Sequence, residues 1–191
     1  MAIHITDDPA SDELLSESPF ALLIGMMLDQ QYPMEHAFMG PQKVASRLGS
    51  FDPAEIASAD PEEFARLCAT TPAIHRFPGS MSARLQEIAR IVVDQYDGDA
   101  SRIWSEAEDG KDLLKRVQAL PGFGAQKAKI FVALLAKQLG VRPEGWEKVA
   151  GDYALEGHRS VADVVDPASL QKVRDHKKAM KAKAAKVAEQ T

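Results

Sequence analysis

The chain has 191 residues, of which 45% are hydrophobic and 27% charged, and its formal net charge at pH 7 is −5. This profile is typical of a globular protein with one domain or two small lobes that bury a core without disulfides. The only cysteine, Cys68, excludes an intramolecular disulfide and an iron–sulfur cluster held by cysteines of this chain.

The N-terminal residues 1–17 are rich in acidic residues, and we interpret them as an acidic N-terminal arm. No basic segment precedes an apolar core there, and no apolar run in the chain approaches the roughly 20 residues that a membrane span needs. We therefore expect a cytoplasmic protein without membrane contact. The acidic residues of this arm are Asp7, Asp8, Asp12, Glu13 and Glu17.

Helix signals dominate the rest of the chain. Pro19, Pro53, Pro61 and Pro167 each follow a Ser or an Asp, which places an N-capping residue before a proline at the first helical position. Apolar residues recur at helical spacing and no segment sustains a strand-like alternation, so we predict an all-α fold. The predicted helices, with breaks at 40–41 and 70–79, are 19–31, 34–38, 42–49, 53–58, 61–69, 80–96, 101–107, 110–119, 125–139, 144–151 and 167–186.

The stretch Leu120–Lys129 connects two of these helices through a glycine turn. Gly122 and Gly124 permit positive φ and the close approach of another backbone, and we expect Phe123 to enter the core. The first N–H groups of a helix lack partners within the helix, so such a turn can bind a phosphate. The alternative is a turn that only connects two helices. The candidate DNA-binding residues of this hairpin are Gly122, Phe123, Gly124, Ala125, Gln126, Lys127 and Lys129.

At these residues the sequence resembles the helix-hairpin-helix-GPD superfamily of base-excision DNA glycosylases, which includes endonuclease III. The matching pieces are Ser18–Gln31, which ends in Leu-Asp-Gln-Gln, and residues 77–93, 120–130 and 139–149. The resemblance covers about residues 18–150 and implies two helical lobes with a central cleft around a helix-hairpin-helix motif. It also implies a nucleoid-associated monomer that binds double-stranded DNA, flips a damaged or mispaired base into the cleft, and needs no cofactor or metal.

The resemblance assigns roles to residues outside the hairpin. By position, Gln31 fills the gap left in the duplex, and Met81 lies near the wedge position, where an apolar side chain parts base steps. Tyr32 can stack on an extruded base, and with His36 and Gln126 it forms the predicted base pocket. Three structural alternatives stay open: Gln31 ends a helix, Met81 is a core contact, and His36 is a surface histidine.

The family's catalytic pattern is altered in this chain. Bifunctional members use a lysine two residues after the second glycine, a position that Gln126 occupies here; Lys127 is rotated from it by about 100° on a helix. The resemblance therefore implies a monofunctional hydrolase without lyase activity. The family aspartate corresponds to Glu144, with Asp152 as a second candidate; either carboxylate could stabilise an oxocarbenium-like sugar. Glu144 could instead be a helix N-terminal residue favoured by the macrodipole.

The sequence thus divides into an acidic arm (1–17), a glycosylase-like domain (18–166, with the hairpin at 113–131) and a basic C-terminal helix or tail (167–191). Residues 172–191 contain seven Lys or Arg and two acidic residues, a local charge of +5, whereas the other 171 residues carry −10. The basic segment either attracts phosphates or is a solvated helix face. A non-catalytic binder of distorted DNA and a helical interaction protein are the alternatives to a glycosylase.

Overall fold

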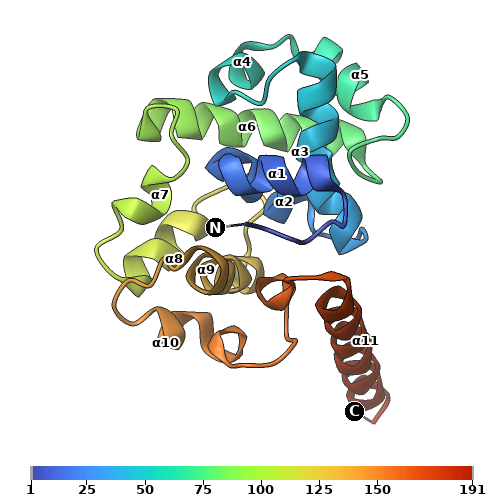
Figure 1. Ribbon diagram of the computed structural model, residues 1–191, viewed down its shortest axis with the longest axis vertical. Coiled ribbons are helices and arrows are strands. Elements are labelled where there is room, and N and C mark those ends of the chain that lie inside the picture. Colours follow the sequence, from blue (N-terminus) through green and yellow to red (C-terminus); the bar gives the residue numbers. More distant parts are fainter. Residues whose placement is uncertain (1, 191) are drawn as a thin grey trace.

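The computed structural model describes residues 2–190, which form eleven α-helices and two 3₁₀ helices and contain no strand (Figure 1). The predicted all-α fold is confirmed. One lobe contains α1 (Pro9–Glu17), α2 (Pro19–Leu28), α3 (Met34–Leu48), α4 (Pro53–Ser58), α5 (Pro61–Ala69) and α6 (Pro78–Tyr96). The remaining elements are α7 (Arg102–Ser105), α8 (Gly110–Gln118), α9 (Ala125–Leu139), α10 (Trp146–Ala150), η1 (Gly151–Ala154), η2 (Val161–Asp163) and α11 (Pro167–Glu189).

The predicted helix starts owe their positions to side-chain caps. The side chains of Ser18, Asp52, Asp60 and Asp166 each accept a hydrogen bond from a backbone N–H in the first turn of the helix that follows. Each cap satisfies a donor that has no partner within the helix, and substitution of such a cap by alanine typically costs about 1 kcal/mol. The local sequence therefore determines where α2, α4, α5 and α11 begin.

The first lobe is built around α2, in which every residue after Pro19 is buried. Helix α2 packs against α1 and α3, while α4 and α5 pack against α6. A Cβ atom at Gly25 would lie only 2.5 Å from the ring of Phe38, so this glycine allows α2 and α3 to approach closely. The C-terminal end of α2, which carries the predicted DNA-contacting loop, is thereby held from several sides.

The second lobe is arranged around α9, which packs against α8, α10, η1 and η2. Its buried face includes Phe131, Leu134 and Leu135, and these side chains belong to the same hydrophobic core as the first lobe. The two groups of helices lie one above the other in Figure 1, with α6 and α2 above α8 and α9. Because both lobes share one core, they hold the hairpin and the end of α2 in fixed relation.

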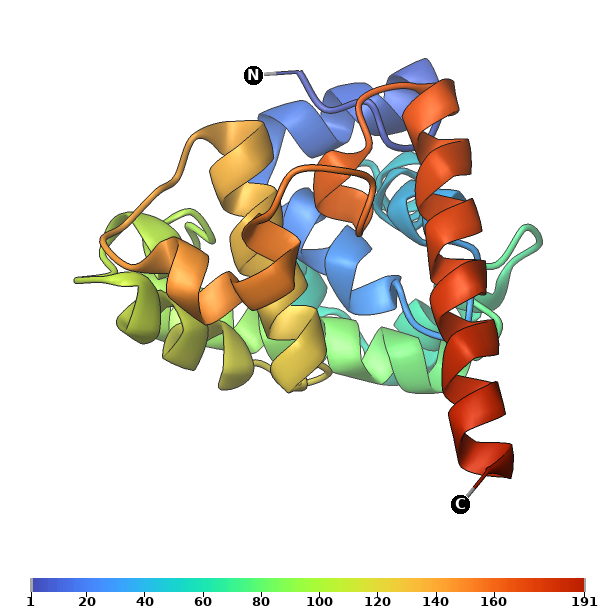
Figure 2. The same cartoon turned by 90° about the horizontal axis from the view of Figure 1, so that it is seen from below.

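Helix α11 is the most exposed long element. Only Ser169, Leu170 and Val173 are buried, and its C-terminal end extends past the other helices (Figure 2). Its first turns pack against η2 of the second lobe. The basic C-terminal segment is therefore a helix that begins on the second lobe and extends beyond the rest of the molecule.

Two sequence predictions of local structure are wrong. The predicted acidic arm is a packed part of the first lobe: α1 contacts α2 and α3, and Ile3, Ile5 and Leu15 are buried. The carboxylate of Asp12 faces inward, where it accepts hydrogen bonds from the backbone N–H groups of Ile5 and Thr6. An acidic residue can be buried when donors surround it, which a charge pattern alone does not reveal.

The second error is the predicted break at residues 40–41. Helix α3 runs without interruption from Met34 to Leu48 and contains Pro41 in its interior. An interior proline removes one hydrogen bond and typically costs about 3 kcal/mol. Burial of Phe38, Val44 and the proline itself against neighbouring helices offsets this cost.

Candidate nucleic-acid interface and base pocket

The glycine turn between α8 and α9 is rigid on its inner side. Gly122 has a φ of +83°, a conformation that side chains disfavour, and the N–H of Phe123 donates to the carbonyl oxygen of Leu120 at 3.2 Å. The side chain of Phe123 is 4% exposed, and its ring centroid lies 5.8 Å from that of Phe131. The predicted role of Phe123 as the residue that anchors the turn in the core agrees with this placement.

The outer side of the turn is open. No side chain caps the first turn of α9, and Gly124, Ala125 and Gln126 are exposed. A Cβ atom built on Gly124 would meet nothing within 4 Å. The first N–H groups of α9 therefore face accessible space at the positive end of a 15-residue helix, which is the arrangement that binds a phosphate.

Arg84 of α6 adds a positive charge beside this turn. A Cβ atom at Gly122 would lie 2.7 Å from Cδ of Arg84 and 3.3 Å from its Nη1 atom. Arg84 is not among the residues predicted from the sequence, because nothing in the local pattern of α6 indicates that it packs against the hairpin. The arrangement joins an amide-lined turn to a guanidinium group, both suited to an anionic oxygen.

Lys127 occupies a different place from the one predicted. Its Nζ atom points between the lobes and donates to the carbonyl oxygen of Met27 at 2.9 Å. Burial lowers the pKa of Lys127 to about 8, opposed by the charge of Asp29. Burial likewise raises the pKa of Asp29, opposed by Lys177 and Lys127. Lys127 thus connects α9 to the end of α2 and lies away from the open face of the turn.

A pocket of about 570 Å³ adjoins the first turns of α9, and we refer to it as the hairpin pocket. This volume is in the range of sites that hold small organic groups. The amide Nε2 of Gln126 donates to the hydroxyl of Tyr153 at 2.8 Å, and Asp152 lines the same pocket. Its lining residues are Gln126, Lys129, Ile130, Ala150, Gly151, Asp152, Tyr153, Arg159, His176, Lys177, Met180 and Lys181.

The structure separates the two candidate carboxylates. Asp152 lies in η1, on the wall of the hairpin pocket, whereas Glu144 does not line it. The carbonyl oxygen of Glu144 accepts a hydrogen bond from the N–H of Gly110, the first residue of α8. The glycine turn follows the other end of α8, about one helix length away, or roughly 13 Å at 1.5 Å per residue. Counting residues from the hairpin selects Glu144, but the chain after it folds into the short helix α10 and brings Asp152 to the pocket.

A second hollow, which we call the loop pocket, lies at the C-terminal end of α2. Gln31 is exposed there with a φ of +52°, a left-handed conformation that is uncommon for residues other than glycine. Such strained residues cluster at functional sites. The loop pocket is lined by Asp29, Gln30, Gln31, Tyr32, Pro33, Arg76, Lys177 and Lys181.

Of the three residues predicted for a base pocket, Tyr32 and His36 lie together, with ring centroids 5.9 Å apart, whereas Gln126 lies elsewhere. Gln126 lines the hairpin pocket and Tyr32 lines the loop pocket, while His36 lines neither. The ring of Tyr32 packs against that of His75 at a centroid distance of 4.8 Å. The side chain of His36 is 52% exposed, which fits the surface-histidine alternative.

Met81 is a core residue rather than an exposed wedge. Its side chain is 4% exposed, and its Sδ atom accepts a hydrogen bond from Nε2 of Gln30 at 3.5 Å. The exposed apolar side chain at this end of α6 is Phe77, the N-cap residue of the helix, at 47% exposure. Phe77 was not predicted as the wedge, because helical periodicity alone does not show which apolar residue at the start of α6 is exposed to solvent.

The described residues offer little other chemistry. No group of three or more His, Cys, Asp or Glu residues within 2–190 is arranged to hold a metal ion. Burial raises the pKa of the Cys68 thiol to about 12, which keeps it protonated and unreactive. None of the helices in the described part of the chain is long and apolar enough to cross a membrane.

An all-α fold with an open amide turn, a cation beside that turn and an adjoining pocket defines a helix-hairpin-helix protein of the nucleic-acid-binding class. The chain belongs to the HhH-GPD superfamily of base excision DNA repair proteins, whose family model matches residues 24–190. The predicted family is therefore confirmed. Neither a curated protein nor a solved structure matches the chain.

Proposed function

We propose that this protein is a monofunctional DNA glycosylase, which hydrolyses the N-glycosidic bond of a damaged or mispaired base. The observation that carries this proposal is the juxtaposition of Gln126 and Asp152 in one pocket beside the open glycine turn. The turn holds a backbone phosphate, and the flipped nucleotide enters the hairpin pocket. Family membership supports a DNA substrate and a role in base excision repair.

Asp152 supplies the carboxylate in this proposal. Departure of the base leaves positive charge on the sugar, and a carboxylate placed beside it stabilises that charge and orients a water molecule for attack. Gln126 presents an amide where a lysine would act as nucleophile, and its bond to the hydroxyl of Tyr153 fixes its orientation. Glu144, at the far end of α8, is too distant from the turn to share the same sugar.

Two exposed residues are suited to the duplex around the flipped nucleotide. Gln31 extends from the loop after α2 and is suited to fill the vacated space. Phe77 replaces the buried Met81 as the side chain that parts base steps, because Phe77 is a large apolar side chain that is exposed at this end of α6. Both residues belong to the first lobe, opposite the hairpin.

A second candidate function is a non-catalytic sensor of distorted DNA. The observation in its favour is the replacement of the family lysine by Gln126 together with the position of Glu144 outside the pocket. Such a protein would use the same open turn to bind the backbone without cleaving the glycosidic bond.

Single-turnover excision assays on duplexes that each contain one lesion or mismatch test the proposal. We expect at least one base to be released, and we expect Asp152→Asn to slow its release by about 100-fold or more while affinity stays within about threefold. Glu144→Gln is the matched control and should retain the activity of the unchanged protein. Tight binding without release of any base would favour the non-catalytic sensor, and loss of activity in the control alone would return the role to Glu144.

A further inference from the structure

Helix α11 lies between the hairpin pocket and the loop pocket. Lys177 and Lys181 line both of them, and residues four apart occupy the same face of a helix. One face of α11 therefore forms a cationic wall shared by the two hollows. The proposed glycosylase mechanism uses the opposite wall, formed by α9 and η1, and leaves this one without a role.

Two ion pairs fix α11 against the first lobe. Arg174 pairs with Glu35 of α3, and the Nζ atom of Lys177 lies 3.9 Å from Oδ2 of Asp29. The carboxylates are mostly buried, with side-chain exposures of 13% for Glu35 and 9% for Asp29. The second oxygen of Glu35, Oε2, is buried without a hydrogen-bond partner, so Arg174 is the main compensation for this charge. The direction of α11 is thus set by contacts with both lobes.

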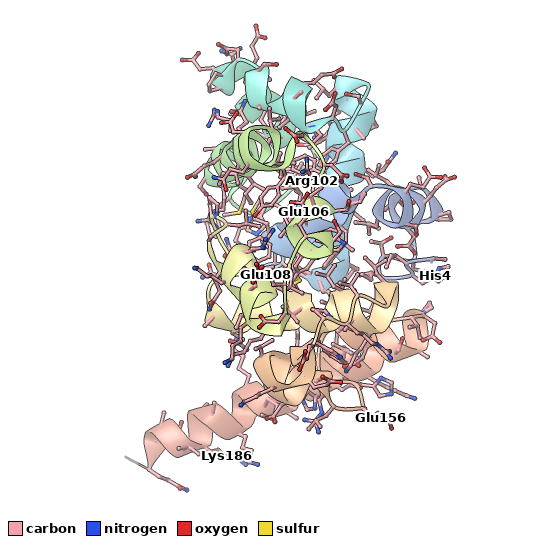
Figure 3. All side chains as sticks on the ribbon, turned by 90° about the vertical axis from the view of Figure 1, so that its left-hand side faces the viewer. His4, Arg102, Glu106, Glu108, Glu156 and Lys186 are labelled. Atoms are coloured by element: carbon pink, nitrogen blue, oxygen red, sulfur yellow. The ribbon has the colours of Figure 1, made fainter. Side chains whose placement is uncertain are left out.

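Beyond these anchors the helix is exposed and strongly cationic. Lys178, Lys181, Lys183 and Lys186 form no ion pair within residues 2–190. Lys186 lies on the projecting end, well away from the rest of the molecule (Figure 3). A helix with several uncompensated lysines gains most from an external polyanion.

On the basis of the proposed function, we infer that α11 is a second DNA-backbone contact, in which Lys177 and Lys181 bind phosphates of the duplex that flanks the flipped nucleotide. Lys129 and Arg159 line the hairpin pocket as well, so cations continue from α9 across to α11. A strand held at the glycine turn would pass between two positively charged walls. The ion pairs Glu35–Arg174 and Asp29–Lys177 act as positioning contacts, because they hold α11 in its orientation before DNA binds.

Fluorescence anisotropy with a labelled duplex that contains one tetrahydrofuran abasic-site analogue tests this inference. Affinity is measured between about 50 and 200 mM salt, because each phosphate contact contributes about 0.9 to the slope of log affinity against log salt. We expect Lys181→Gln to lower the slope by about 0.9 and to weaken binding roughly 5- to 10-fold. The control is Lys178→Gln, which removes the same charge from the same helix but lines neither pocket, and its slope should stay unchanged.

The outcomes separate this inference from the proposed function. If the unchanged protein binds and the two variants behave alike, whether both weaken or neither does, α11 makes no specific backbone contact and only this inference is overturned. If the unchanged protein does not bind the duplex, the proposed function and this inference both fail. Circular dichroism of each variant verifies that the helix content is retained.

Glu35→Gln provides an independent test, because the two explanations predict opposite changes in DNA affinity. Removal of a negative charge near a DNA-binding face strengthens binding if only general electrostatics matter. If Glu35 instead positions α11, the same substitution weakens binding by several-fold, because the helix loses its ion pair with Arg174. A rise in affinity would overturn the positioning role of Glu35.

Discussion

Gly124 illustrates how a single residue can be selected by a ligand rather than by the fold. Its φ of −70° is accessible to any residue, and a side chain there would meet nothing within 4 Å. Neither backbone strain nor packing therefore requires glycine at this position, in contrast to Gly122 with its φ of +83°. The proposed function supplies a reason for glycine here, because the absence of a side chain lets a phosphate approach the amides of α9.

We predict that Gly124→Asp separates stability from binding. Asp is a favourable N-cap residue, so the free energy of unfolding should stay the same or rise by a few tenths of a kcal/mol. Its carboxylate would block and repel a phosphate, and DNA affinity should fall by about tenfold or more. Urea denaturation and anisotropy measure the two quantities. Gly124→Ser adds a side chain without charge and should have a smaller effect on affinity; unchanged affinity in the Asp variant would contradict the role of the turn.

At the scale of elements, the sequence predicts what is encoded locally. The range of α9 and those of α4 and α5 agree with the predicted 125–139, 53–58 and 61–69, because proline, capping and glycine signals mark their ends. Helix α1 was not predicted, because its acidic residues mask the one apolar residue of the helix that is fully buried, Leu15. The continuous α3 was also missed, because a Gly-Pro pair indicates a break unless tertiary packing offsets its cost.

The candidate site could be predicted only in part, because only some of its residues are close together in the sequence. The glycine turn is local, and its residues were identified from the sequence. The partners of that turn are not local: Arg84 comes from α6, Asp152 follows α10, and α11 lines both pockets. A fixed spacing selects Glu144, because it assumes a connection of constant length after α9.

His75 connects the loop that carries Gln31 to the start of α6, and its protonation should affect stability. Its Nδ1 atom accepts from the N–H of Phe77 at 3.0 Å, which places the proton on Nε2 for the 2.8 Å contact with the carbonyl oxygen of Gln30. Burial lowers the pKa of His75, against the opposing effect of the bond to Gln30, and the charges of Lys127 and Arg76 lower it further. Only the neutral ring can make both contacts.

We therefore predict a loss of stability on acidification. A histidine with a lowered pKa in the folded state contributes its full stability above the unfolded value of 6.5 and loses it as the pH falls through the folded value. The free energy of unfolding of the unchanged protein should decline below about pH 6.5 more steeply than that of His75→Gln. Urea denaturation at several pH values measures the difference, and parallel curves for the two proteins would show that His75 does not contribute.

At the scale of the whole molecule, the net charge of −5 does not describe the face that we propose contacts DNA. The open turn, Arg84, Lys129 and the lysines of α11 lie at or beside the two pockets, and no residue of acidic α1 lines either of them. Because charges are screened beyond about 8 Å at physiological salt, this local arrangement determines the attraction of phosphates. An acidic protein can thus present a basic binding face.

The amine of Lys127 lies between the two lobes, and this position predicts that it does not react with an abasic site. A lysine with a pKa of about 8 is partly neutral at pH 8, so its protonation state alone would permit attack on a sugar aldehyde. Its Nζ atom, however, donates to the carbonyl oxygen of Met27 between α9 and α2 and lines neither pocket. We expect borohydride to trap no covalent complex between the protein and abasic-site DNA at pH 8, as judged by denaturing electrophoresis. A bifunctional glycosylase serves as the positive control for trapping. An adduct that disappears in Lys127→Met would show that the lobes open to expose this amine, and the monofunctional assignment would then be wrong.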